Sequence, residues 1–106
     1  MAWFLLLCAG LLEIVWASAM KQSDGFTRIL PTAIMLAAML ASITLLAVAM
    51  KSLPLGTAYA VWTGIGAVGA FLVGLFVLGE AASPMRIAAA LLIVAGLALM
   101  KLSETA

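Results

Sequence analysis

The sequence consists of long apolar stretches separated by short groups of charged residues. Only five Lys and Arg and four Asp and Glu occur among 106 residues, and 68% of the chain is apolar. Soluble domains carry about 25% charged residues, so this chain has too few charges to cover a water-facing surface. The pattern therefore predicts a membrane protein with a single domain, because a chain of this length has room for only one.

Charged groups and prolines mark the expected helix ends. The charges gather in KQSDGFTR at 21–28, in KSLPLG at 51–56, in GEAASPMR at 79–86 and in the tail from 101. Each of the three prolines lies where an apolar stretch begins, which suits the first turn of a helix. We therefore expect an all-α domain over 1–106 with four transmembrane helices, at about 2–20, 30–50, 54–79 and 84–102. A span needs roughly 20 residues, and a helix satisfies its own backbone groups in lipid.

The distribution of Lys and Arg predicts how the chain inserts. With four spans, both ends of the chain lie on one side of the membrane. Lys21, Arg28 and Arg86 then lie on the other side, whereas Lys51 and Lys101 lie with the ends. Because Lys and Arg set orientation and their numbers are nearly equal, we expect insertion in both orientations. The alternative is that lipids or partners decide the orientation.

Glu13, within LLEIVW at 11–16, is the charged residue that lies outside these groups. No Lys, Arg or His lies inside the spans to neutralise it. An ionised carboxylate in a dry site is costly, so such surroundings favour the protonated form. Three roles stay open: a neutral packed acid, an acid facing a second Glu13 of another subunit, or a group that exchanges a proton for a cation. We favour a functional role, since ionisable residues inside membranes are functional candidates by default.

Aromatic residues near Glu13 indicate a cation site. Trp16 lies one helical turn from Glu13, and Tyr59 and Trp62 share a face of the third helix. Aromatic rings attract cations, and Tyr and Trp can also donate hydrogen bonds to a carboxylate. The alternative is a belt of aromatic residues at the membrane interface. Ser42, near the middle of the second helix, either donates to a backbone carbonyl one turn earlier or reaches Glu13.

The third helix contains the glycine-rich segment GIGAVGAFLVG at 64–74. Gly64, Gly66 and Gly69 either let helices pack closely or permit a bend. Their spacing also resembles a dinucleotide-binding fingerprint, but no strand precedes the segment and no soluble domain surrounds it. The fourth helix offers only small and apolar residues over 87–100, which favours a role in assembly.

The size of the chain argues for assembly and against catalysis. Four short helices make a bundle too narrow to enclose an aqueous path, so we expect two copies in opposite orientations, which would mimic the inverted repeats of larger transporters. The chain has no His and a single Cys, and it lacks a metal-binding cluster or a nucleophile beside a base. We therefore expect no enzymatic activity, no metal, no cofactor and no nucleic-acid partner.

The chain resembles the small multidrug resistance transporters over essentially its whole length. The resemblance rests on AWFLLLCAGLLEIVWASAMKQSDGFTR at 2–28 and on LPLGTAYAVWTGIGAVGA at 53–70. Within this family, Trp16, the segment WTGIGAVGA and Lys101 resemble the guanidinium exporter branch. The multidrug branch typically has a small residue at the position of Trp16.

The resemblance implies an antiparallel homodimer in the bacterial cytoplasmic (inner) membrane that exports guanidinium-type cations in exchange for protons by alternating access. It implies that Glu13 binds proton and substrate, that Trp16, Ser42, Tyr59 and Trp62 line the site, and that the glycines at 64–69 bend the third helix. The residues alone indicate a small cation, and guanidinium comes from the resemblance. Two alternatives remain, which are export of quaternary ammonium cations and a membrane assembly subunit that transports nothing.

Overall fold

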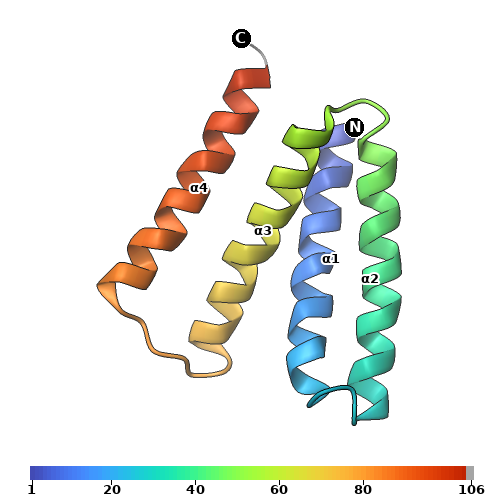
Figure 1. The fold of residues 1–106 in the computed structure, drawn as a ribbon, viewed down its shortest axis with the longest axis vertical. Coiled ribbons are helices and arrows are strands. Elements are labelled where there is room, and N and C mark those ends of the chain that lie inside the picture. The colour runs from blue at the N-terminus through green and yellow to red at the C-terminus, as the bar shows by residue number, and fades with distance from the viewer. Residues whose placement is uncertain (105–106) are drawn as a thin grey trace.

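The computed structural model describes residues 1–104, which form four α-helices joined by short loops (Figure 1). In chain order these are α1 (Ala2–Gln22), α2 (Ile29–Ala49), α3 (Leu55–Phe76) and α4 (Pro84–Glu104). The four expected helices are present, and their ends lie within three residues of the expected positions. All four are long and apolar enough to cross a membrane. A helix of this length spans about 31 Å, which matches a hydrocarbon core about 30 Å thick.

The end of α3 and the position of Pro54 differ from the expectation. α3 ends at Phe76 because the chain turns at Gly79, whose φ of +71° is a left-handed conformation that glycine adopts easily. The Glu80 N–H then donates to the Gly74 carbonyl at 2.9 Å, so the turn satisfies a carbonyl in the last turn of the helix. Pro54 precedes α3 as its N-cap residue, where an extended ψ of 152° places it outside the first turn.

The four helices form one flat layer in the order α4, α3, α1, α2 (Figure 1). α1 packs against both α2 and α3, whereas α4 packs, among the described helices, against α3 alone. The subunit measures 45 × 35 × 16 Å. The helices lie side by side, and no second layer of described helices covers them (Figure 1). Large parts of every helix are therefore exposed to the surroundings of the subunit.

The buried core lies toward the end of the molecule at which α1 begins. It consists of side chains from the first half of α1, the end of α2, the following loop and the first half of α3, namely Leu6, Ala9, Leu46, Ala49, Leu53, Ala58, Val61 and Trp62. At the same end the Lys101 Nζ atom lies 4.8 Å from the centroid of the Trp3 ring. This cation–π contact joins the end of α4 to the start of α1, although the two helices do not pack together.

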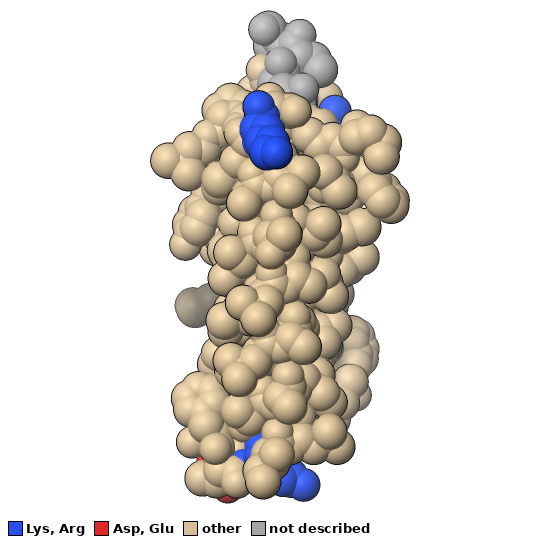
Figure 2. Space-filling model, turned by 90° about the vertical axis from the view of Figure 1, so that its right-hand side faces the viewer, with Lys and Arg blue, Asp and Glu red and all other residues tan. Residues whose placement is uncertain are grey.

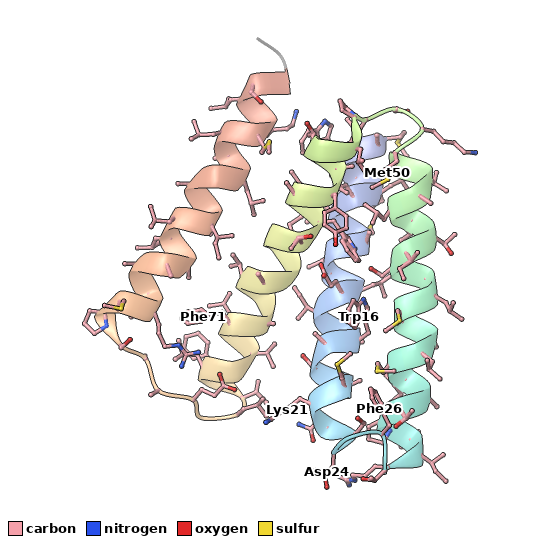
Figure 3. All side chains as sticks on the ribbon, in the orientation of Figure 1. Trp16, Lys21, Asp24, Phe26, Met50 and Phe71 are labelled. Atoms are coloured by element: carbon pink, nitrogen blue, oxygen red, sulfur yellow. The ribbon has the colours of Figure 1, made fainter. Side chains whose placement is uncertain are left out.

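Apart from Glu13, the described charged side chains lie toward the two ends of the molecule. The face in Figure 2 shows blue atoms near the top, blue and red atoms near the bottom, and a broad uncharged band between them. Lys21 and Asp24 lie at one end and Met50 at the other (Figure 3). Many large apolar side chains in the band are exposed, such as Leu92 (73%) and Phe76 (78%). In a membrane these side chains contact lipid or another subunit, so their exposure agrees with a membrane-spanning fold.

Candidate functional site

Glu13 projects from the middle of α1 toward α3, where it lies against Gly66. A Cβ atom added at Gly66 would overlap the Oε1 and Cδ atoms of Glu13 and would lie 2.8 Å from its Cγ atom. The absence of a side chain at Gly66 therefore provides the space in which the carboxyl group lies. The glutamate is half-buried in the subunit. Sequence analysis did not identify this contact, because the relative register of two apolar helices has no clear sequence signal.

The Glu13 carboxyl group has no polar partner within the described part of the subunit. Its Oε1 atom is buried and forms no hydrogen bond with residues 1–104, and no cationic side chain there lies within ion-pair distance. A buried oxygen without a donor is costly, so a proton or an external cation would stabilise it.

Ser42 connects the three helices α1, α2 and α3 by hydrogen bonds. Its fully buried Oγ donates to the Ala9 carbonyl of α1 at 2.6 Å and accepts from the Trp62 Nε1 atom of α3 at 3.0 Å. Both sequence-based alternatives for Ser42 are therefore wrong in this conformation, since it bonds neither to its own helix nor to Glu13. Its donor goes to a residue 33 positions away, a contact that only the tertiary arrangement creates.

Tyr59 and Trp62 form an aromatic pair on α3. Their ring centroids lie 5.5 Å apart, and the ring planes are tilted by 49°. Trp62 is 8% exposed and belongs to the core, whereas Tyr59 is 54% exposed. Trp62 therefore helps to fix the site, and Tyr59 presents its ring and hydroxyl group to whatever lies beside the subunit.

Trp16 lies on α1 between the two ends of the bundle, one turn from Glu13 (Figure 3). Its side chain packs against the core cluster, and its Nε1 atom is buried without a hydrogen-bond partner in residues 1–104. Trp16 therefore does not donate a hydrogen bond to Glu13 in this conformation. The site thus contains a donor and an acceptor, one turn apart, that are both unsatisfied.

The glycines of α3 contact two different helices. Gly66 and Gly69 face α1, where added Cβ atoms would overlap Glu13 and Ile14 respectively. Gly64 faces α4, where an added Cβ would lie 2.5 Å from the Leu97 Cδ2 atom. Gly10 of α1 faces Ile65, where an added Cβ would lie 2.5 Å from the Cγ2 atom. The sequence did not predict this packing contact of Gly10. These contacts support close packing, and since α3 is continuous here, a bend at Gly64–Gly69 stays a prediction.

The fold and the site define a class of protein. Among residues 1–104, no group of three or more His, Cys, Asp and Glu side chains could hold a metal ion. The arrangement instead combines an uncompensated carboxyl group with aromatic rings and a buried hydroxyl group, which suits a desolvated organic cation. The chain is thus a small multi-pass membrane protein with a carboxyl group inside its apolar layer.

Comparison with known proteins agrees with this class. A family model described as Small Multidrug Resistance protein matches residues 1–94. Proteins named "Guanidinium exporter" from Escherichia coli strain K12, Citrobacter freundii and Salmonella typhimurium are each 58% identical over 103 residues. These matches cover 97% of this chain and 98% of each relative. The chain therefore belongs to the small multidrug resistance family, which confirms the resemblance found in its sequence.

Proposed function

We propose that this protein exports guanidinium and small guanidinyl cations across the bacterial cytoplasmic membrane in exchange for protons. The observation that carries the proposal is the half-buried Glu13 carboxyl group, whose Oε1 atom has no donor or cation inside the described subunit. The names of the relatives that share 58% of its sequence point to guanidinium as the cation.

Competition for one carboxyl group explains the exchange. Guanidinium is flat, and its N–H groups match the two oxygens of a carboxylate in a bidentate arrangement. Binding needs the ionised carboxylate, whereas the protonated carboxyl group has lost the charge that attracts the cation. Proton and cation therefore exclude each other. Net exchange follows when the protein changes conformation mainly while either a proton or a cation is bound, and rarely while the site is empty.

The surroundings of the carboxyl group suit a flat cation. Trp16 lies one turn away, and the aromatic pair Tyr59 and Trp62 comes from the neighbouring helix. We assign Trp16, Tyr59 and Trp62 to the lining of the substrate site, with Ser42 holding Trp62 in position through its hydrogen bond. An ionised Glu13 would attract the free Trp16 N–H, which would orient the carboxylate for the substrate.

We further propose that the working unit is an antiparallel homodimer with alternating access. Three features support it: the nearly balanced Lys and Arg at the two ends, the packing of α4, among the described helices, against α3 alone, and the exposed ring of Tyr59. A second copy would cover the open side of the site and contribute its own Glu13. Gly64, Gly66 and Gly69 would let α3 bend as the opening changes sides.

The direct test is Glu13→Gln in proteoliposomes. The amide keeps the shape of the side chain but cannot exchange a proton or neutralise a cation. We expect loss of guanidinium uptake driven by a pH gradient, while the protein stays folded and assembled. Asp24→Asn is the control, because it also replaces a carboxylate by an amide, in the exposed loop between α1 and α2. Substantial pH-driven uptake by Glu13→Gln would disprove the proposal.

A further inference from the structure

A second polar region lies at the end of the molecule opposite the start of α1. It is a pocket of about 350 Å³ between α1, α3 and the loop that leads into α4. Lys21 lines it from α1, Phe71 from α3, and Glu80 and Arg86 from the loop and the first turn of α4. The Lys21 side chain extends toward this loop in Figure 3. Glu13 is not among the lining residues, so the pocket is separate from the candidate transport site.

The loop before α4 fixes two charged side chains at this pocket. Arg86 donates from one guanidinium nitrogen to the Ala81 carbonyl at 2.8 Å and from the other to Glu80 at 3.4 Å. Its Cζ atom also lies 5.4 Å from the centroid of the Phe71 ring. The Glu80 carboxylate lies against Gly74, where an added Cβ would be 2.5 Å from Oε1. Arg86 and Glu80 therefore have defined positions.

Lys21 makes the pocket positively charged. It forms no hydrogen bond or ion pair with any of residues 1–103, whereas the Glu80 charge is offset by Arg86. Two cations and one carboxylate leave a net charge of one positive unit beside the pocket. A ligand with a single negative charge would complement it.

The pocket continues into an apolar groove between α3 and α4. An adjacent cavity of about 230 Å³ shares Phe71 and Arg86 with the charged pocket. A further cavity of about 360 Å³ shares Phe71 and Ala90 with that second cavity, and every residue that lines it is apolar. The charged pocket lies near the end of the spans, and the two cavities adjoin it along the second half of α3 and the first half of α4. A cationic pocket followed by an apolar groove matches the polarity of a phospholipid.

We propose that this pocket binds the phosphate of an anionic phospholipid, with one acyl chain lying in the groove between α3 and α4. The Lys21 ammonium and the Arg86 guanidinium group would both donate to phosphate oxygens. A free phosphate ion would leave the groove unfilled, and an uncharged lipid would leave Lys21 without a counter-charge. The lipid would fill the space beside α4, which packs against α3 alone among the described helices.

Native mass spectrometry of the purified full-length protein tests this inference. The probes are dioleoyl phosphatidylglycerol, dioleoylglycerol with the same chains but no phosphate, and inorganic phosphate. We expect retention of phosphatidylglycerol alone. Lys21→Gln should weaken it about five-fold, since a Lys near a membrane surface contributes about 1 kcal/mol toward anionic lipid. Lys21→Arg, which keeps the charge, should retain it.

Two further variants separate the pocket from general effects. Arg28→Gln removes one cation at the same end of the molecule but outside the pocket, so it should leave lipid retention unchanged. Ala90→Phe fills the groove without changing any charge, so it should weaken retention. Circular dichroism of each variant shows whether its helices are intact. If Lys21→Gln fails this check, Ala90→Phe tests the pocket, and if Ala90→Phe fails, Lys21→Gln tests it.

Several outcomes would overturn the inference. Equal losses for Lys21→Gln and Arg28→Gln would show general attraction to an anionic surface. Equal retention of dioleoylglycerol would show an apolar groove without a phosphate site, and tight binding of inorganic phosphate would show a small-anion site. If Lys21→Gln disrupted subunit association but not lipid retention, the pocket would belong to a contact between copies.

Discussion

Replacing Gly66 by Ala tests whether this glycine provides space for the Glu13 carboxyl group. The new Cβ would overlap the Glu13 Oε1 and Cδ atoms and lie 2.8 Å from Cγ, well inside an ordinary contact. Glu13 must then leave its place or α1 must move away from α3. Overpacking of this kind costs about 1–3 kcal/mol. If this cost destabilises the conformation in which Glu13 lies against Gly66, the equilibrium shifts from it toward other conformations by roughly 5- to 150-fold.

The assay is guanidinium binding by calorimetry together with uptake into proteoliposomes. We expect Gly66→Ala to reduce guanidinium uptake by roughly 5- to 150-fold. Gly69→Ala is the matched control, because it adds the same methyl group on the same helix and toward the same neighbour, α1. Its Cβ would overlap the Cδ1 and Cγ1 atoms of Ile14, so it disturbs the packing of α1 against α3 without touching the Glu13 carboxyl group. Gly69→Ala should therefore have a smaller effect.

A second change checks the cause. Glu13→Asp shortens the side chain by one methylene and so withdraws the carboxyl group from position 66. It should therefore reduce guanidinium uptake less in the Gly66→Ala background than in the unaltered protein. Such coupling between the two changes is what contact between them predicts. If instead Ala at positions 64, 66 and 69 caused equal losses and Glu13→Asp showed no coupling, the glycines would act through helix flexibility and the reasoning would fail.

The remaining predictions concern the site and the topology. Ser42→Ala should destabilise the protein by about 1–3 kcal/mol, because the buried Trp62 N–H loses its acceptor; thermal unfolding in detergent measures this, and an unchanged midpoint would contradict it. Guanidinium affinity should fall as the pH falls, because protonation removes the carboxylate; pH-independent calorimetric affinities would refute the competition. Trp16→Gly should reduce guanidinium transport and admit bulkier cations, whereas an unaltered protein that already carries aromatic quaternary ammonium ions well would indicate the multidrug alternative. A Lys added within 22–27 or within 52–56 should fix opposite orientations that are active only when co-expressed, and full activity of one form alone would exclude the antiparallel pair.

The four helices could be predicted well from the sequence because a membrane imposes simple requirements on the length and polarity of a spanning helix. A span needs about 20 apolar residues, and charges must lie near its ends, so both features are visible in one sequence. The end of α3 was less predictable. The apolar residues continue through Leu78, but the left-handed turn at Gly79 takes the chain out of the helix.

The contacts of the candidate residues were harder to predict than which residues stand out in the sequence. Glu13 stood out because an acid within a span is rare, and the structure places it half-buried against Gly66. Which atom Ser42 bonds depends on how α2 lies against α1, and hydropathy does not encode that register. The contact between Glu13 and Gly66 depends in the same way on how α1 and α3 cross. Small residues such as Gly10 and Gly66 mark possible crossing points but do not say what meets them.

The even number of helices constrains how this chain could evolve. The start of α1 and the end of α4 lie at the same end of the molecule, where Lys101 contacts Trp3. A gene duplication that joined two copies directly, tail to head, would therefore place both halves in the same orientation. A fused descendant with its halves inverted would need an extra span between them, or an odd number of spans in each half. As long as oppositely oriented partners are required, separate chains from one gene are the simplest way to supply them.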